Sequence, residues 1–312
     1  MKNYFSFNQT GQKLFPIWIL FYVLFLAPYF YLIFQMQHIQ QGVMPPMYIL
    51  PAFLILIVVA FFLQFYIFKF IIEGVVYKDK NLVFSGSPGV FLGKVVLGIV
   101  LSGITLGIYT AWFVRDVTRF FVNNTSHDSE KLEFRGTGGR LFVILLLTLI
   151  IPIIILSLLL IKFMGNMIGM GFLERCVFQM VEILILIPYM YFVYKWTVDI
   201  KFKDYIISWK TETMPSLLKL AQEIVLSLVT LYIYFPLATV RLYKYFMERT
   251  VAEGTERKLH FGYDIDQKGD FLAIWKEILL SIITLGLYYP WAICNINKRV
   301  LGKTFTETID AI

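Results

Sequence analysis

Long apolar stretches separated by short polar segments make up most of the chain, and they predict membrane helices. Four of them, residues 14–34, 47–70, 141–163 and 177–196, each hold about twenty residues or more, the length that a helix needs to cross a hydrocarbon core of about 30 Å. The first stretch is too long for the apolar core of a signal peptide, so we interpret it as the first spanning helix.

Three further apolar stretches, residues 91–113, 217–240 and 271–293, share one internal pattern. In each, a serine stands three residues before a threonine-leucine pair, and a tyrosine follows the threonine by four residues. The residues are Ser102, Thr105 and Tyr109 in the first copy, Ser227, Thr230 and Tyr234 in the second, and Ser281, Thr284 and Tyr288 in the third. We interpret this pattern as an internal repeat.

The Thr-Leu-Gly-Ile-Tyr element of the repeat predicts a break in the helix. Threonine and isoleucine are stiff at χ1, glycine is conformationally permissive, and a following proline ends or kinks a turn. In the first copy, the helix before the break would cover residues 91–104 and would measure about 21 Å at 1.5 Å per residue. That length is short of a full crossing.

The distribution of basic residues favours hairpins over full crossings at the three repeats. If only the four long stretches cross, every Lys and Arg except Lys162 and Arg175 falls on one side of the membrane, and the loop at residues 35–46 carries none. If all seven stretches cross, both sides are basic. Basic residues mark the cytoplasmic side, so the first arrangement is preferred.

The predicted fold class is therefore all-α: a polytopic membrane protein with four spanning helices, three re-entrant or interfacial helical hairpins, and both termini in the cytoplasm. Seven spanning helices are the alternative. We divide the chain into residues 1–126, with two spans and one hairpin, and residues 127–312, with two spans and two hairpins. Short segments such as Phe84-Ser-Gly86 and Phe134-Arg-Gly136 precede several apolar stretches, and we expect them to be extended and to lie at the membrane interface.

The composition agrees with a membrane protein. Hydrophobic residues make up 58% of the chain and charged residues 16%, against about 25% charged in a soluble domain. This excludes a soluble enzyme, a disordered chain and a disulfide scaffold. The net charge of +7 indicates a cytoplasmic face and not nucleic-acid binding, because no basic run with interleaved aromatic residues stands apart from the apolar stretches. We expect membrane lipids as partners.

The repeat resembles the YjgN-like family of bacterial inner-membrane proteins. The shared signature is an F-x-G opening, then T-L-G-I-Y-x-P-W and a basic helix, here at residues 105–112 and 284–291. The first copy has Ala111 in place of the proline, and the middle copy has Tyr232 and Leu237 in place of the glycine and the tryptophan. The resemblance covers about residues 84–301. It implies the bacterial inner membrane and no established activity.

The sequence lacks recognisable motifs for metal binding or catalysis. The three histidines, His38, His127 and His260, fall in different loops, and none has a second ligand at zinc spacing. No nucleophile elbow or metalloprotease motif occurs. We therefore expect no metal, no cofactor and no enzymatic activity.

Charged residues inside the apolar stretches are a sharper functional signal, because charge is costly in a membrane. Glu223 and Glu277 both stand seven residues before the threonine of their repeat, and Glu182 lies in the fourth span. One hypothesis is that these glutamates and the Ser, Thr and Tyr residues of the repeats line a polar pathway along one helix stripe. The alternative is that shallow hairpins let the glutamates reach cytoplasmic water while the hydroxyls bond helix to helix.

Basic residues follow each predicted break, beside Trp and Tyr. They are Arg115 and Arg119 after the first break, Arg241 and Lys244 after the second, and Lys298 and Arg299 after the third. This composition suits interfacial helices that face anionic lipid headgroups. Snorkelling of long basic side chains explains it equally well.

Two functions follow from these patterns. The first is a non-enzymatic inner-membrane protein that transports or gates a small solute, ion or lipid through a site built from the broken-helix repeats. The second is a membrane scaffold or lipid-organising protein with a basic cytoplasmic face. A cavity that reaches Glu223 and Glu277 would favour the first, and solidly packed hairpins would favour the second.

Overall fold

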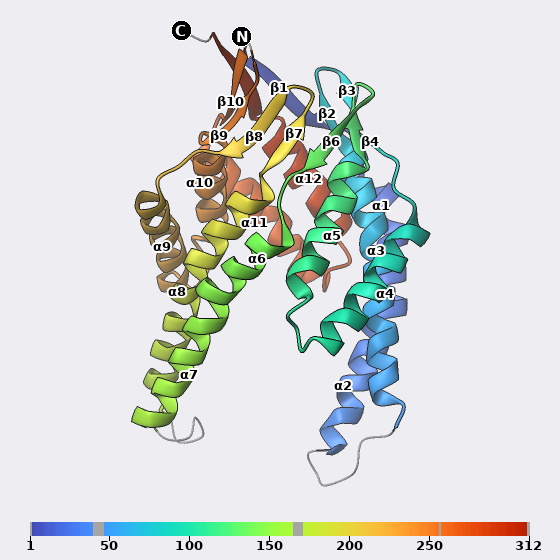
Figure 1. Ribbon diagram of the computed structural model, residues 1–312, viewed down its shortest axis with the longest axis vertical. Coiled ribbons are helices and arrows are strands. Elements are labelled where there is room, and N and C mark those ends of the chain that lie inside the picture. The colour runs from blue at the N-terminus through green and yellow to red at the C-terminus, as the bar shows by residue number, and fades with distance from the viewer. Residues whose placement is uncertain (1, 40–46, 165–170, 256, 311–312) are drawn as a thin grey trace.

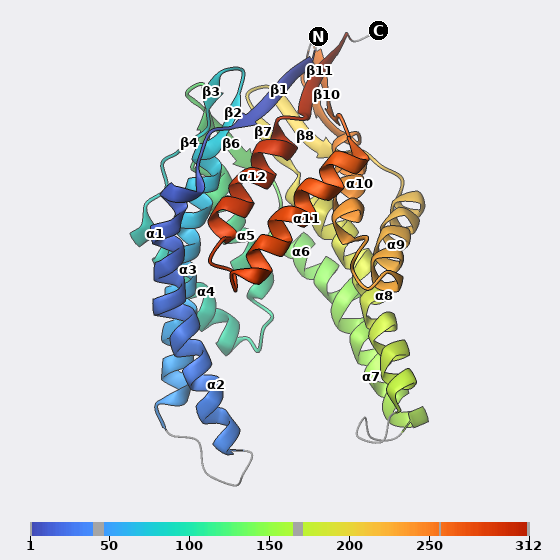
Figure 2. The same cartoon turned by 180° about the vertical axis from the view of Figure 1, so that it is seen from behind.

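The computed structural model describes residues 2–39, 47–164, 171–255 and 257–310. Short strands gather at one end of the molecule, together with both termini, and the helices extend from them toward the other end (Figure 1). Seen from behind, the two longest helical pairs reach furthest from the strands, and shorter pairs lie between them (Figure 2).

The strands are β1 (Lys2–Phe7), β2 (Val75–Tyr77), β3 (Lys80–Asn81), β4 (Val83–Phe84), β5 (Thr125–His127), β6 (Glu130–Phe134), β7 (Ile200–Phe202), β8 (Tyr205–Trp209), β9 (Thr250–Glu253), β10 (Arg257–Tyr263) and β11 (Thr304–Asp310). The helices are α1 (Gly11–Phe21), α2 (Ala27–Ile39), α3 (Ile49–Gly74), α4 (Pro88–Ile104), α5 (Thr110–Asn123), α6 (Gly138–Leu145), α7 (Ile151–Met164), α8 (Phe172–Thr197), α9 (Thr213–Val229), α10 (Phe235–Met247), α11 (Gln267–Ile283) and α12 (Tyr289–Leu301). Single π-helical segments, Tyr22–Leu26 and Leu146–Ile150, join α1 to α2 and α6 to α7.

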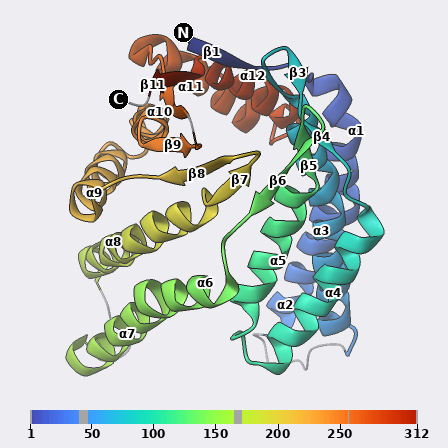
Figure 3. The ribbon, with the colours of Figure 1, turned by 45° about the horizontal axis from the view of Figure 1, so that its top comes forward.

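The prediction of an all-α fold is wrong. Within the described residues, eleven strands form one antiparallel sheet in the order β3-β2-β1-β11-β10-β9-β8-β7-β6-β5-β4. The two strands at the ends of this order, β3 and β4, are separated in the sequence only by Leu82, whose N–H donates to the carbonyl of Val75 at 2.9 Å. The sheet therefore nearly closes into a barrel, which Figure 3 shows from its strand end.

The strands escaped the sequence prediction because they are short and lie in the polar connections between helices. Each has two to seven residues, too few for a clear alternation of apolar and polar positions. Tight turns join several of them. Lys78-Asp79 and Asp128-Ser129 both have positive φ values, between 48° and 66°, as in the two-residue turns whose twist matches that of a hairpin.

Five successive units build the molecule, each with a strand, a helical hairpin and a returning strand. The five run from β1 to β2, β4 to β5, β6 to β7, β8 to β9 and β10 to β11. Helices of neighbouring units pack against one another around the ring, and α12 of the last unit contacts α1 of the first. The helices thus close in the same circular order as the barrel.

One backbone hydrogen bond holds the base of every hairpin. The residue after the first strand donates its N–H to the carbonyl of the residue just before the returning strand. The five bonds join Asn8 to Gly74, Ser85 to Asn124, Arg135 to Asp199, Lys210 to Arg249 and Asp264 to Lys303, over 2.8–3.0 Å.

A buried aromatic residue ends the first strand of every unit, and a second buried residue follows seven positions later. The aromatic residues are Phe7, Phe84, Phe134, Trp209 and Tyr263, and the second residues are Leu14, Phe91, Leu141, Ser216 and Asp270. Each aromatic side chain lies in its own hydrophobic cluster, which also includes side chains of a neighbouring unit. The core is therefore divided into five clusters between units.

The four long helical spans occur where the sequence predicted them. Within the described residues, the helices long and apolar enough to cross a membrane are Gly11–Met36, Ile49–Gly74, Gly138–Leu159 and Phe178–Thr197. The alternative of seven spans does not agree with the structure, because α4, α9 and α11 each end at the repeat threonine and the chain turns back. How deeply these hairpins enter a bilayer stays a prediction, as does the division between residues 126 and 127. The two loops predicted to face outward include residues 40–46 and 165–170, which lie outside the described residues, as does the side chain of Lys162.

Closure of the barrel predicts a specific cross-link between its first and last strands. Lys2 lies directly opposite Glu307 in the β1–β11 pair, a separation that suits a disulfide. In a chain with Cys176 and Cys294 replaced by alanine and a protease site inserted within residues 165–170, we expect Lys2→Cys with Glu307→Cys to keep the two proteolytic fragments joined on a non-reducing gel. The pair Lys2→Cys with Lys201→Cys on β7, which also places one cysteine in each fragment but on strands that are not neighbours, should not. Equal cross-linking of both pairs would contradict the strand order.

Candidate functional site

Three acidic side chains are buried in the last two hairpins. Glu223 lies on α9, and Asp270 and Glu277 lie on α11. A buried carboxylate is stable only when it is paired and hydrogen-bonded, or when it is protonated. Their partners therefore distinguish structural carboxylates from a candidate binding group.

The Glu223 side chain is completely buried, and both of its carboxylate oxygens accept hydrogen bonds from side chains of its own hairpin. Its carboxylate accepts from Lys219 Nζ at 2.5 Å and from the Tyr234 hydroxyl at 2.7 Å. Arg241 donates to the same hydroxyl at 2.6 Å and also reaches Gln267 at the start of α11. Through Arg241 and Gln267 the network joins the fourth and fifth units.

Glu277 occupies the equivalent position in the third repeat but lacks a cationic partner among the described residues. One carboxylate oxygen accepts from Asn295 at 3.1 Å, and the other, Oε2, is buried without a hydrogen-bond partner in the described structure. The side chain is 6% exposed. Asn295 stands where the second repeat has Arg241, eleven residues after the threonine, so the cation of one site is replaced by an amide in the other.

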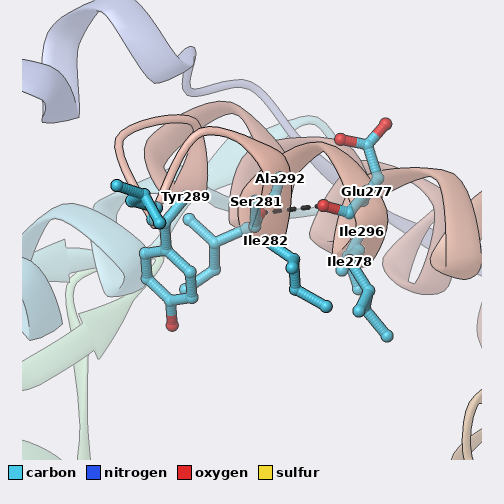
Figure 4. Close-up of a pocket in the computed structure, with 10 residues that line it drawn as sticks. Glu277, Ile278, Ser281, Ile282, Tyr289, Ala292 and Ile296 are labelled. Carbon is cyan, nitrogen blue, oxygen red and sulfur yellow. Dashed lines mark hydrogen bonds between the residues drawn. The ribbon is translucent and has the colours of Figure 1, made fainter.

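Two adjoining cavities border Glu277. The larger, of about 450 Å³, is an apolar groove along α11 and α12. The smaller, of about 200 Å³, also includes Asn295 and Arg299. Ile278, Ile282 and Tyr289 point to one side of the hairpin, while the Glu277 carboxylate points to the other (Figure 4). Glu277 and Ile296 line both cavities.

Asp270 is a structural carboxylate that the sequence analysis missed. It accepts from Arg299 at 2.7 Å, Lys303 at 2.5 Å and the Tyr263 hydroxyl at 2.9 Å. Burial alone would raise the pKa of Asp270, but the hydrogen bonds from Lys303 and Arg299 outweigh it and hold that pKa below its ordinary value. Its position seven residues after Tyr263 was the signal that could have identified it.

The repeat threonines build the turns. Each hydroxyl donates to the carbonyl four residues earlier, at 2.7–2.8 Å, and accepts the N–H of the repeat tyrosine at 2.9–3.1 Å. Leu106, Leu231 and Leu285 follow with φ of 49–51°. Gly107 and Gly286 take the next left-handed position, and in the middle copy Tyr232 adopts it with φ of 64°, so the substitution of the glycine does not remove the break.

Only some of the repeat serines and tyrosines lie close to the buried glutamates. Ser227 and Ser281 donate to the backbone carbonyls of Glu223 and Glu277, both at 2.8 Å. The Tyr288 hydroxyl accepts from Asn295 Nδ2 at 3.5 Å. The first copy has Gly98 at the position of Glu223 and Glu277, where a Cβ would overlap the ring of Phe113. Its Ser102 hydroxyl is buried without a partner in the described structure.

The remaining candidates lie apart from this site. Glu182 is exposed on α8, and no described interaction joins it to Glu223 or Glu277. Of the six basic candidates, four have protein partners: Arg115 with Asp116, Arg241 with Tyr234, Lys244 with Glu248, and Arg299 with Asp270. Within the described residues, Arg119 and Lys298 form no ion pair, and no group of three or more His, Cys, Asp or Glu could hold a metal ion.

Comparison with known proteins gives two matches. Residues 79–210 match the family described as a bacterial protein of unknown function, DUF898. A segment of 80 residues is 35% identical to inner membrane protein YjgN of Salmonella typhimurium, strain LT2, and covers 26% of this chain. The match spans about a fifth, 20%, of the length of that relative. No solved structure matches the chain.

The turn geometry predicts that the repeat threonines contribute to stability through their acceptor role. Thr284→Val removes the acceptor of the Tyr288 N–H, and we expect it to lower the free energy of unfolding by about 1–2 kcal/mol. Thr118→Val on α5 is the matched control, because Thr118 only donates to a helix carbonyl. Thermal unfolding in one detergent should show a clearly lower Tm for Thr284→Val than for Thr118→Val, and equal Tm values would contradict this role.

The partners of Asp270 predict an acid-labile contribution to stability. We expect Asp270→Asn to cost about 2–3 kcal/mol, less than for a fully buried pair because Arg299 and Lys303 keep some access to water. Asp264→Asn, at an exposed pair with Lys2, should cost less than about 1 kcal/mol.

The pH dependence gives a second measurement at Asp270. Because the pKa of Asp270 in the folded state lies below the unfolded value of 3.8, the contribution is complete only above about pH 5 and is lost progressively as the pH falls through the unfolded and then the folded pKa. Unfolding measured between pH 7 and pH 3 should therefore show a smaller acid-induced loss in Asp270→Asn than in the wild type. An unchanged acid profile in this variant would argue against the assignment.

Proposed function

We propose that this chain, which is similar to a bacterial inner-membrane protein over part of its length, is a non-enzymatic inner-membrane protein that moves or gates a lipid or similar amphiphile at the membrane. In this proposal both termini and the barrel lie on the cytoplasmic side, in keeping with the distribution of Lys and Arg. The observation that carries it is the buried Glu277 carboxylate, which has one unpartnered oxygen in the described structure and belongs to a side chain that lines both an apolar groove and a smaller cavity.

The tips of the three short hairpins support insertion into one leaflet. Leu106, Leu231 and Leu285 are 94%, 83% and 85% exposed. They lie in the turns that join α4 to α5, α9 to α10 and α11 to α12, at the opposite end of each hairpin from its strands. Large exposed apolar side chains at such tips are favourable in lipid and costly in water. Helices of 17 residues, such as α11, measure about 26 Å, so the hairpins enter the bilayer without crossing it.

The two cavities at Glu277 suit a molecule with a polar head and an apolar body. The apolar groove along α11 and α12 would hold a hydrocarbon segment, and the smaller cavity would hold a head that donates hydrogen bonds. An ammonium group satisfies the free Oε2 and balances the charge of the carboxylate, which low-dielectric surroundings make costly when it is unpaired. The proposed cargo class is therefore an amine-bearing lipid such as phosphatidylethanolamine.

The test uses protein reconstituted into vesicles of phosphatidylethanolamine and phosphatidylglycerol. A trace of phosphatidylethanolamine labelled with NBD on an acyl chain keeps its ammonium group free, and dithionite quenching then reports transfer between leaflets. We expect the wild type to accelerate transfer and Glu277→Gln to lower the accelerated rate at least fivefold. Glu248→Gln, the same change at an exposed carboxyl group, should leave it unchanged. A wild-type rate equal to that of protein-free vesicles would refute lipid movement.

A lipid-organising role is the second candidate, and the Glu223 network favours it. A carboxylate that is completely paired inside its own hairpin is suited to rigid packing and not to exchange with a cargo. Under this function the wild type does not move lipid but retains phosphatidylglycerol during purification. Arg119→Gln and Lys298→Gln should then lower the amount of phosphatidylglycerol that native mass spectrometry detects.

A further inference from the structure

The interior of the barrel holds a cavity that neither candidate function uses. Its volume is about 380 Å³, and its lining includes side chains from β1, β2 and every strand from β5 to β11, with Leu82 between β3 and β4. Small-molecule sites commonly have volumes of about 300–1,000 Å³. The strands that line it gather at one end of the molecule (Figure 3), and the cavity shares no lining residue with the groove at Glu277.

Aromatic rings form much of the cavity wall, namely Phe5, Tyr77, Phe202, Tyr205 and Phe261. Phe5 stacks on Tyr77 with ring centroids 4.6 Å apart and lies 6.4 Å from Phe261. The Tyr77 hydroxyl is held by Thr306 at 2.7 Å. Small residues such as Ala252 and Thr308 also line the cavity, which leaves room for a planar body against the rings.

His127 places one oriented polar group in this wall. Its Nε2 lies 2.9 Å from the carbonyl oxygen of Tyr77, and because a carbonyl only accepts, Nε2 carries a proton. The ring is buried and packs beside Phe202. Its other nitrogen is then the acceptor of a neutral imidazole, or a donor when the ring is protonated.

The charged side chains of the cavity are mainly basic: Lys78, Lys203 and Arg257 against Asp128. Asp128 is already bonded to Lys80 and lies 3.9 Å from Lys203. Lys78 and Arg257 form no ion pair within the described residues. The basic side chains therefore attract anions, and the aromatic rings of the wall favour an apolar body.

We propose that the barrel binds a small aromatic carboxylate, with its ring against the aromatic wall and its carboxylate between Lys203 and Arg257. Binding combines burial of the apolar ring with charge-assisted hydrogen bonds from Lys203 and Arg257 to the carboxylate. The site shares no residue with the groove at Glu277, so it stands independently of lipid movement.

The experiment is calorimetric titration of 2-naphthoate into the full chain in lipid nanodiscs, with empty nanodiscs subtracted. We expect saturable binding of one molecule per chain and weaker binding of the uncharged 2-naphthalenemethanol. Lys203→Gln and Arg257→Gln should each weaken binding roughly two- to fivefold, as loss of a partly exposed charge contact does. Lys201→Gln is the matched control, because this exposed lysine of the same strand pair does not line the cavity.

Thr308→Trp adds a steric test. It places a large side chain in the cavity and should abolish binding of 2-naphthoate while the thermal unfolding curve stays close to that of the wild type. If this variant misfolds, Arg257→Gln at its exposed strand end carries the test alone. The proposal is overturned if 2-naphthoate shows no saturable binding, if the uncharged probe binds as tightly, or if Lys201→Gln weakens binding as much as Lys203→Gln.

Discussion

Closure of a ring of short hydrogen-bonded strands is the constraint on which the rest of the structure depends. Strands of two to seven residues are too short to be stable in isolation, and an open sheet would expose unpaired backbone groups at both edges. Because the strand from residue 80 to residue 84 pairs with β2 on one side and β5 on the other, neither edge stays free. The spacing of the five hairpins then follows from the spacing of the strands.

The five units share one arrangement of strands and helical hairpins, but they differ in the residue types at equivalent buried positions. Seven residues after the strand-end aromatic residue, the first three units have apolar side chains, whereas the last two have Ser216 and Asp270. Buried polar groups need partners, and both find them, in Tyr245 for Ser216 and in Arg299 and Lys303 for Asp270. The buried glutamates also belong to these last two units, so the polar interior is concentrated in one part of the ring.

The sequence predicted the helices well and the sheet poorly. Apolar runs of about twenty residues have a strong signal, and the repeated threonine marked the breaks that the structure places at Leu106, Leu231 and Leu285. The strands had no such signal, because their partners are more than 200 residues apart in pairs such as β1 and β11. Glu223 and Glu277 could be found from their shared spacing. Their different hydrogen-bond partners, Tyr234 for Glu223 and Asn295 for Glu277, could not be assigned before the turns were known. Asp270 was missed because it lies outside the repeat pattern.

Pairing of β1 with β11 also sets the order of events during synthesis. Lys2–Phe7 emerges from the ribosome long before Thr304–Asp310, with which it pairs. At about 5–20 residues per second, roughly 15–60 s pass between the two. Throughout that interval the helical hairpins form one after another while the barrel stays an open arc with a free edge at β1. The last unit thus acts as the closing segment, and the molecule becomes a ring only when translation has delivered it.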